Sequence, residues 1–254
     1  MSTPSAPGPE AAGPPPEPRD LAPYRRRVVR VVEGQHLIST NRLAASPEAQ
    51  ALLEALVEEV KPPWPEAARG LHFLLATPFR YGHRFGSRFR SAGQRPGIFY
   101  ASEGIAAAIA ETAYLRMRFF SRSPGAVLPA TTTEYTSFSV PVRAERALDL
   151  TLPPFAGRTA LWTSDDYRPC RQLAAAARAI SAQAIRYRSA RDPAGGINLA
   201  LLDPSGFTAA APRIEQSWHF RFVGASLAIL ASFPARDRFG FDFADFGLRP
   251  PETV

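Results

Sequence analysis

Arginine, tyrosine, glutamate and serine side chains gather in four short stretches of the sequence, mostly at the expected edges of strands and loops. The stretches are FRYGHRFGSRFR (79–90), IFYAS (98–102), AETAYLR (110–116) and RYRSARDPAGGINLALLD (186–203). An arginine guanidinium can bind phosphate through two parallel hydrogen bonds. A tyrosine adds a flat ring for stacking and a hydroxyl that orients a ligand, and a carboxylate can stabilise positive charge that develops beside it.

The helix expected to carry Glu111 places this residue at the edge of an apolar stripe. Ser102 is expected to cap the helix, with Glu103 in its first turn. The stripe consists of Ile105, Ala108, Ile109, Thr112 and Leu115. At about 100° per residue, Glu111 lies about 60° from Ala108, so we expect it to point across a groove. Taken alone, Glu111 is more simply interpreted as a helix-side carboxylate paired with Arg116 or another neighbour.

Hydrophobic periodicity and turn residues predict mixed helices and strands without a repeating strand–helix–strand unit. Helices are predicted over 46–63, after Ser102 and over 171–185. Strands are predicted over 24–40, 71–81, 95–102, 131–142 and 197–203, while 219–232 fits either a strand or a helix. In the first helix Ser46 is the expected cap, Pro47 fits the first turn, and the apolar face is expected to pack. These elements predict one α+β domain.

The charge of the chain brings anionic partners into consideration. The net charge is +7 and the pI is about 10.1, and nearly all of the excess is arginine because the sequence has one lysine. The arginines are scattered, and no basic block or basic–aromatic interleaving is present. Direct nucleic-acid binding is therefore disfavoured, although it remains an alternative.

Other classes of protein find little support in the sequence. No apolar stretch approaches the roughly 18 residues of a membrane helix, and no secretory signal pattern is present. The single cysteine, Cys170, is expected to be a half-buried structural thiol, which together with these absences favours a cytoplasmic location. The histidines lack metal-ligand spacing, so no metal is expected and each is interpreted as structural or exposed. They are His36, His72, His83 and His219.

The order of the polar stretches resembles the RES-domain family, which is named for a conserved arginine, glutamate and serine. The match runs from about Phe79 to Asp203 and rests on the order GSRFR, GIFYAS, A-x-A-E, then RYRSAR and GGINLALLD. The resemblance implies an α+β domain with a small, strongly bent sheet, related to ADP-ribosyltransferases. It also implies NAD⁺ as substrate rather than as a resident cofactor.

The resemblance also assigns roles to individual residues. It implies that Glu111, Arg80 and Ser189 are catalytic. The residues that it implies bind NAD⁺ are Arg80, Tyr81, Arg88, Tyr100, Ser189 and Arg191. Whether Arg88 or the adjacent Arg90 is the functional arginine stays open. Each of these residues, taken alone, also fits an ordinary structural or surface position.

The activity implied by the resemblance is breakage of the nicotinamide–ribose bond of NAD⁺, by phosphorolysis or hydrolysis. Members of the family are often toxins of toxin–antitoxin pairs, neutralised by a helix-turn-helix antitoxin of the Xre type. Inorganic phosphate is then a second expected partner, and a membrane is not. An alternative is a protein ADP-ribosyltransferase, so the acceptor can be phosphate, water or a protein. A non-catalytic partner-binding protein is the alternative from another class.

The expected division of the chain has three parts. Residues 1–23 are predicted to be a disordered, proline-rich tail and 24–70 an N-terminal extension packed on the domain. Residues 71–254 are predicted to form the catalytic domain. Within it, the aromatic and acidic segment FGFDFADFGLRPPETV (239–254) is expected to pack on the domain rather than to touch a partner.

Overall fold

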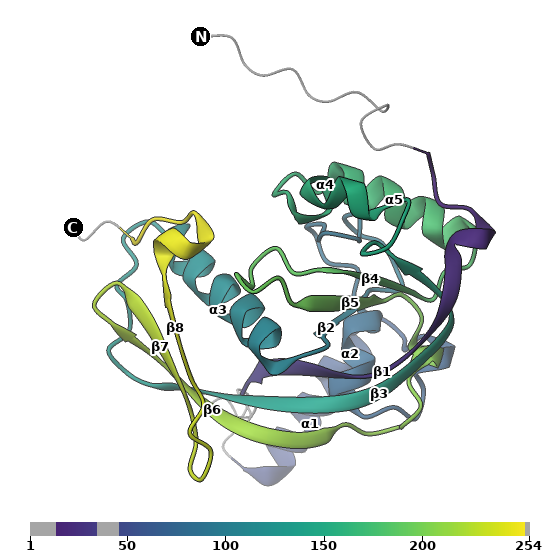
Figure 1. Cartoon of the computed structure of the whole chain (residues 1–254). Coiled ribbons are helices and arrows are strands. Elements are labelled where there is room, and N and C mark those ends of the chain that lie inside the picture. The colour runs from purple at the N-terminus through teal and green to yellow at the C-terminus, as the bar shows by residue number, and fades with distance from the viewer. Residues whose placement is uncertain (1–13, 35–45, 252–254) are drawn as a thin grey trace.

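Eight strands form one sheet that curls until its first strand pairs with two others. The structure is a computed structural model that describes residues 14–34 and 46–251. The strands are β1 (Leu21–Glu33), β2 (Phe99–Ser102), β3 (Thr133–Asp149), β4 (Ala184–Arg188), β5 (Ile197–Leu201), β6 (Arg213–Val223), β7 (Ser226–Ala231) and β8 (Arg238–Asp242). The α-helices are α1 (Pro47–Glu59), α2 (Phe73–Arg80), α3 (Ile105–Ser121), α4 (Thr159–Thr163) and α5 (Arg168–Ala179) (Figure 1). The fold is therefore mixed α/β with a single sheet.

The pairing of β1 closes part of the sheet into a ring. The sheet order is β1-β2-β5-β4-β3-β6-β7-β8, with an additional pairing of β1 and β3. Val29 of β1 lies opposite Ser102 of β2 and opposite Ser139 of β3. Strands β3 and β4 run parallel, and the remaining neighbours are antiparallel. The sheet is strongly bent, as expected, but its eight strands make it larger than the small sheet that the sequence predicted.

The apolar side chains form three clusters around this sheet. One cluster lies between α3 and β6–β8, and it includes Ile109, Trp218 and Phe220. A second cluster fills the ring of strands around Phe99 and Phe138. The third holds α4 and α5 against β4 and β5. Helix α3 is thus fixed on one face by the β6–β8 extension while another face remains beside β1, β2 and β5 (Figure 1).

Several predicted elements are confirmed and others are wrong. The strands in 24–40, 95–102, 131–142 and 197–203 are present, although residues 35–45, including His36, lie outside the described part. Residues 71–81 form helix α2 rather than a strand, and its buried residues Leu75, Ala76 and Phe79 have helical spacing. A short apolar run does not distinguish the two structures by periodicity. The helix predicted over 171–185 ends at residue 179, where β4 soon follows.

The two N-terminal capping predictions have different outcomes. Ser46 caps α1 by accepting a hydrogen bond from the Ala49 amide at 3.2 Å. Ser102 does not cap α3, because it is the last residue of β2 and Gly104 occupies the cap position. The apolar face of α1 was expected to pack, but Leu52 is 62% exposed and Val60 is 84% exposed. That expectation is wrong.

Both ends of the described chain are built into the domain. Strand β1 begins at Leu21, inside the predicted tail of residues 1–23, and it pairs with β3 along its length. Residues 219–232 form the β6–β7 hairpin rather than a helix. Phe241, Phe243 and Phe246 are buried, so the C-terminal aromatic segment packs as expected. None of the helices in the described part of the chain is long and apolar enough to cross a bilayer.

Candidate functional site

A cavity of about 340 Å³ lies between α3, the strands β1 and β2, and the loop that precedes β2. This volume is at the lower end of the range for small-molecule sites. Its titratable and amide-bearing lining residues are Arg30, Arg88, Tyr100, Glu111, Tyr114, Arg118, Tyr167, Tyr187, Arg191 and Asn198. The lining residues therefore include four arginines and one glutamate, a balance that favours an anionic ligand.

Glu111 is held in this cavity by two neutral side chains. Ser189 Oγ donates to Glu111 Oε1 at 2.7 Å, and Asn198 Nδ2 donates to the same oxygen at 2.6 Å. Neither bond uses Oε2. The residues come from three elements, because Glu111 lies on α3, Ser189 follows β4, and Asn198 lies on β5. The two bonds therefore fix the orientation of the carboxylate through Oε1, and Oε2 remains available to contact a ligand.

A further set of hydrogen bonds orients the two donors. Ser102 Oγ donates to Asn198 Oδ1 at 2.6 Å, which leaves the Asn198 amide nitrogen directed at Glu111. Ser189 Oγ accepts the backbone N–H groups of Arg191 at 3.1 Å and Asp192 at 3.0 Å. A hydroxyl has one hydrogen to donate, so these two acceptor contacts leave that hydrogen for Glu111. Ser102 thus acts in the site rather than as a helix cap.

The loop after Ser189 needs a glycine to approach α3. Asp192 accepts the N–H groups of Ala194 and Gly196 at 3.0 and 3.1 Å. A Cβ atom at Gly196 would lie 2.4 Å from Asp192 Oδ2 and 2.8 Å from Ala107 Cβ. Ala107 lies in the first turn of α3, so the close approach joins the serine loop to the helix that carries the glutamate.

Two of the tyrosines that line the cavity, Tyr100 and Tyr187, are in their neutral form. The Tyr100 hydroxyl lies 2.8 Å from Ser87 Oγ and accepts the Phe89 amide at 3.1 Å. Burial raises the pKa of Tyr100 above its ordinary value. Burial and the nearby charge of Glu111 raise the pKa of Tyr187 well above its ordinary value. Both hydroxyls therefore keep their hydrogens at neutral pH.

The structure places Arg88 and Arg191 at the cavity and Arg90 elsewhere. Arg88 Nη1 donates to the carbonyls of Trp162 at 2.6 Å and Ser164 at 2.8 Å. Arg191 lies 3.7 Å from the centre of the Tyr114 ring. Arg90 Nη2 donates to a nearby loop carbonyl, and Arg90 is absent from the cavity lining. Of the two adjacent arginines, Arg88 is the one that faces the cavity.

The structure does not bring Arg80 and Tyr81 to this cavity. Arg80 is buried; its Nε donates to the Pro62 carbonyl at 2.6 Å, and its Nη1 lies 2.6 Å from Glu58 Oε1. Its guanidinium also lies 4.2 Å from the centre of the Trp64 ring. Arg80 therefore ties α2 to α1 and the segment that follows α1. Neither Arg80 nor Tyr81 is among the cavity-lining residues.

Three further cavity residues were missed by sequence reasoning. Arg30 lies on β1, burial lowers its pKa to about 10, and its Nη1 has no hydrogen-bond partner among the described residues. Arg118 lies two helical turns after Glu111, a spacing that places both on one side of α3. Asn198 lies in a stretch that was singled out but not assigned a role. Arg30 had no such signal, because it stands among other arginines and valines in β1.

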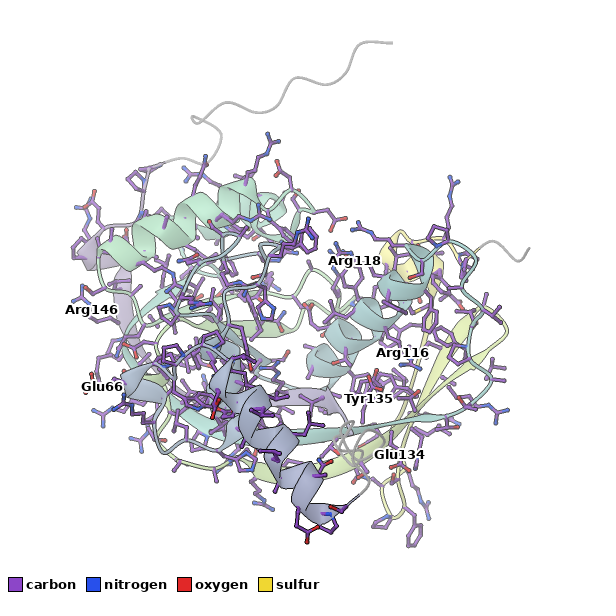
Figure 2. All side chains as sticks on the ribbon, turned by 180° about the vertical axis from the view of Figure 1, so that it is seen from behind. Glu66, Arg116, Arg118, Glu134, Tyr135 and Arg146 are labelled. Carbon is purple, nitrogen blue, oxygen red and sulfur yellow. The ribbon has the colours of Figure 1, made fainter. Side chains whose placement is uncertain are left out.

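Arg116 does not pair with Glu111. Its Nη1 donates to the Tyr135 hydroxyl at 3.1 Å and its Nη2 donates to Thr133 Oγ1 at 2.6 Å. Figure 2 shows Arg116 beside Tyr135, while Arg118 lies nearer the C-terminal end of α3. The simpler interpretation of Glu111 as one half of a surface ion pair with Arg116 is therefore wrong.

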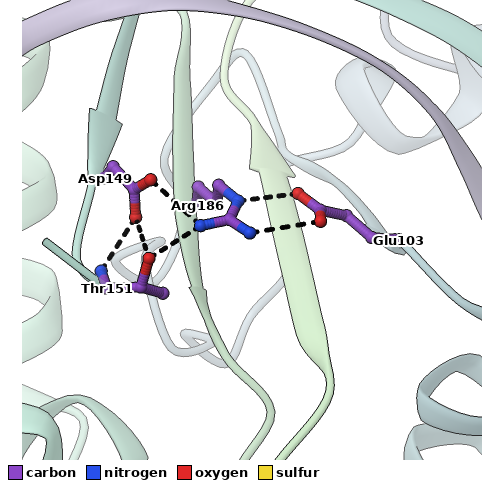
Figure 3. A network of polar contacts seen from close by, with 4 residues as sticks. All are labelled: Glu103, Asp149, Thr151 and Arg186. Atoms are coloured by element: carbon purple, nitrogen blue, oxygen red, sulfur yellow. Dashed lines mark hydrogen bonds and ion pairs between the residues drawn. The ribbon is translucent and has the colours of Figure 1, made fainter.

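A separate polar network supports the start of α3. Arg186 Nε and Nη2 donate to the two carboxylate oxygens of Glu103 at 2.7 and 3.2 Å (Figure 3). Arg186 Nη1 donates to Asp149 Oδ2 at 3.0 Å and to Thr151 Oγ1 at 2.7 Å. The bonds join β4, the end of β3 and the turn between β2 and α3. This network fixes the turn next to Ser102.

The remaining candidate groups have structural roles. Cys170 is fully buried, more than the half-buried thiol that we expected, and burial raises the pKa of its thiol. His72 accepts the Leu74 amide at the start of α2, and His219 bonds to Ser232. No group of three or more histidine, cysteine or acidic side chains in residues 14–34 and 46–251 could hold a metal ion. The absence of a metal from the chemistry stays a prediction.

Comparisons with known proteins place the chain in a family. No curated protein matches it significantly. A chain of the crystal structure titled as the M. tuberculosis MbcT–MbcA toxin–antitoxin complex is 16% identical, with a TM-score of 0.43; the match covers 78% of this chain and 85% of that one. The RES domain matches residues 63–222, which is well over half of the chain. The chain therefore belongs to the RES-domain family.

Proposed function

We propose that this protein breaks the bond between nicotinamide and ribose in NAD⁺, with Glu111 as the central catalytic residue. The observation that carries the proposal is the Glu111 carboxylate, held through one oxygen by Ser189 and Asn198 in a cavity whose lining includes four arginines. NAD⁺ combines two negatively charged phosphates with a positively charged nicotinamide on a ribose carbon. Both kinds of charge have a counterpart in this cavity.

The chemistry requires that positive charge be stabilised as it moves onto the ribose. When the C1′–N bond breaks, its electron pair stays on the nicotinamide nitrogen, which becomes neutral, and the ribose becomes oxocarbenium-like. The carboxylate of Glu111 stabilises that charge or orients the ribose hydroxyls. Water or inorganic phosphate then forms the new bond to C1′, and an attacking water releases one proton to the solvent. Ser189 and Asn198 fix the carboxylate and do not supply the attacking atom.

The arginines of the cavity are assigned to the pyrophosphate. We propose Arg30 in place of Arg80 as the arginine nearest the chemistry, because Arg30 lines the cavity and Arg80 does not. Arg88 and Arg191 keep the binding roles that the resemblance implies, and Arg118 joins them. Tyr100, which lines the same cavity as Glu111, supplies a flat ring for stacking on nicotinamide. Since Arg30 belongs to β1, we propose a catalytic domain that begins before residue 71 and includes β1.

The test follows nicotinamide release from NAD⁺ by chromatography, with and without inorganic phosphate. The wild-type protein is compared with Glu111→Gln and with Glu66→Gln, which removes an exposed carboxylate away from the cavity (Figure 2). We expect Glu111→Gln to lower the rate at least about 100-fold and Glu66→Gln to leave it unchanged. A requirement for phosphate identifies phosphorolysis, and turnover without phosphate identifies hydrolysis. Intact NAD⁺ in every condition would rule out degradation of the free cofactor.

Transfer of ADP-ribose to a protein is the second candidate. Leu115 lines the cavity and is exposed, so an apolar side chain stands at its opening, where a protein acceptor could dock. This reaction breaks the same nicotinamide–ribose bond and uses the same glutamate. The proposed relation of the fold to ADP-ribosyltransferases would agree with this activity. Labelled NAD⁺ incubated with cell extract distinguishes the two. A labelled protein with little loss of bulk NAD⁺ favours transfer.

We also propose, on family membership, that the protein is the toxin of a toxin–antitoxin pair with an Xre-type helix-turn-helix antitoxin. Expression of the chain alone is then expected to arrest bacterial growth, and expression of Glu111→Gln is expected not to. Normal growth with the wild-type chain would favour a non-catalytic partner-binding protein. Salt-dependent binding to nucleic acid that is unchanged by Glu111→Gln would favour the alternative of a basic nucleic-acid-binding protein.

A further inference from the structure

Asp165 forms an ion pair with Arg191, a cavity-lining residue that is far more buried than Asp165 itself. Its Oδ1 accepts a short hydrogen bond from Arg191 Nη2. The side chain of Asp165 is 76% exposed, whereas that of Arg191 is 8% exposed. Asp165 lies in the loop between α4 and α5, so this contact crosses from that loop to the segment after β4. Because the Asp165 carboxylate is already largely hydrated, moving it away from Arg191 into the solvent costs little. The buried Arg191 guanidinium is then left without a counter-ion and favours the binding of another anion.

Two more cavity arginines act on the same carboxylate. The hydrogen bond from Arg191 lowers the pKa of Asp165, and the charges of Arg191, Arg88 and Arg118 add to this effect. Arg118 Nε has no hydrogen-bond partner among the described residues, although it is buried. Arg191 thus contacts the Asp165 carboxylate directly, and the charges of Arg88, from the loop before β2, and Arg118, from α3, act on it without a direct contact.

Aromatic rings hold these guanidinium groups independently of Asp165. The Arg191 guanidinium lies 3.7 Å from the Tyr114 ring centre, and that of Arg118 lies 5.9 Å from the same centre. Arg88 lies 4.7 Å from the Tyr167 ring centre, and it is bound to two backbone carbonyls. Removal of the Asp165 charge therefore leaves the three arginines in place as a preformed site.

We propose that Arg88, Arg118 and Arg191 form a phosphate subsite at the opening of the cavity, and that Asp165 fills it as an internal competitor when no ligand is bound. The inference rests on the proposed function, because it places one phosphate of NAD⁺ where the Asp165 carboxylate now lies. Binding exchanges one anion for another on Arg191. Asp165 thus sets the affinity for the phosphate-bearing part of the substrate and does not touch the reacting bond.

The test compares the affinity of the whole protein for inorganic pyrophosphate by calorimetry. Asp165→Asn removes the competing charge and keeps the side-chain size. Asp166→Asn is the matched control, because it removes the same charge one residue away, where the ion-pair partner is the exposed Arg168. We expect Asp165→Asn to bind pyrophosphate about two- to fivefold more tightly than the wild type, the range that corresponds to loss of an exposed ion pair. Asp166→Asn is expected to match the wild type.

A double variant and a kinetic readout separate competition from simple support of the loop. Arg191→Gln added to Asp165→Asn is expected to remove the gain in affinity. For NAD⁺, Asp165→Asn is expected to lower KM two- to fivefold with kcat unchanged or lower. Pyrophosphate affinity that is unchanged or weaker in Asp165→Asn overturns the competitor role, and lack of any pyrophosphate binding overturns the subsite. Wild-type protein that binds pyrophosphate but releases no nicotinamide overturns the proposed function, and only the anion subsite with its competitor Asp165 is then retained.

Discussion

Ser189 donates its one hydroxyl hydrogen to Glu111 while its oxygen accepts two backbone amides of the loop that it begins. The serine therefore transmits the position of that loop to the carboxylate. It does so without being free to attack a substrate itself, because its donor and acceptor positions are occupied. Under the proposed function, the serine therefore acts through Glu111 rather than on the substrate.

Ser189→Ala is expected to slow NAD⁺ cleavage about 10- to 100-fold, since a hydrogen bond to a charged group contributes about 1.5–3 kcal/mol. The effect is expected in kcat, measured as nicotinamide release at saturating NAD⁺. Ser123→Ala is the control, because Ser123 is partly buried, does not line the cavity, and its hydroxyl donates to the Phe119 carbonyl of its own helix end. A Ser189→Ala variant with wild-type kcat would remove the serine from the catalytic set.

Asn198→Asp places a second carboxylate beside Glu111 without a change in size. Two carboxylates at hydrogen-bond distance cannot both ionise easily, so the pKa of the pair is raised. The acid limb of the pH–kcat profile is expected to move upward by about one pH unit or more. An acid limb at the wild-type position in Asn198→Asp would show that ionisation of Glu111 does not limit the reaction.

Substitution of Arg30 on β1 and substitution of Arg80 on α2 are expected to have different effects. Arg30→Gln is expected to raise KM for NAD⁺ about tenfold or more, because it removes a charged hydrogen-bond donor from the cavity. Arg80→Gln is expected to leave KM unchanged and to lower the free energy of unfolding by about 1–3 kcal/mol, through the lost buried bond to Pro62. Urea denaturation and steady-state kinetics on both variants decide the assignment. A raised KM in Arg80→Gln together with an unchanged KM in Arg30→Gln would instead assign Arg80 to the site.

Cys170 gives the stability of the protein a pH dependence. Burial raises its folded-state pKa above the ordinary value of 9.0, so the folded thiol keeps its proton where the unfolded one loses it. The unfolded state then binds fewer protons, and stability falls as pH rises through about 9 toward the folded pKa. Buried tyrosines contribute a similar slope near pH 10 and above. The difference between wild type and Cys170→Ala isolates the cysteine, measured as unfolding free energy from pH 8 to 10.

A thiol reagent offers an independent check on the same residue. Cys170 is expected to react with a disulfide reagent only after unfolding, because its sulfur is buried among the carbonyls of Leu161 and Trp162. Rapid reaction of the native protein would contradict both the burial and the pKa direction.

The sequence predicted those elements whose patterns are local. Ser46 and Pro47 mark the start of α1 because capping depends on neighbours within one turn. By contrast, α2 was predicted as a strand, since its short apolar run fits either period until its partners are known. The apolar face of α1 looks like a packing face in the sequence, and only the tertiary structure shows that Leu52 and Val60 remain exposed.

The site was predictable where its residues stand in recognisable stretches. Glu111, Ser189, Tyr100, Arg88 and Arg191 were identified and lie in or against one cavity. Arg80 is also an arginine in one of these stretches, like Arg88. Its guanidinium, however, donates to a carbonyl of the segment after α1 and not to the cavity. Arg30 was missed because its place at the cavity depends on the pairing of β1 with β2 and β3. The β1–β2 pairing joins residues more than 70 positions apart in the sequence, and the β1–β3 pairing joins residues more than 100 positions apart.

The closed pairing of β1 has a consequence for the newly made chain. Strand β1 leaves the ribosome first, yet most of its partners lie on β3, and Asn198 follows later still. Such long-range pairing forms slowly and only after the distant strand is available. The cavity is therefore assembled from positions that span residues 29 to 198, and no short nascent fragment contains it. The lining of the cavity is therefore complete only after synthesis has passed Asn198, long after β1 has been made.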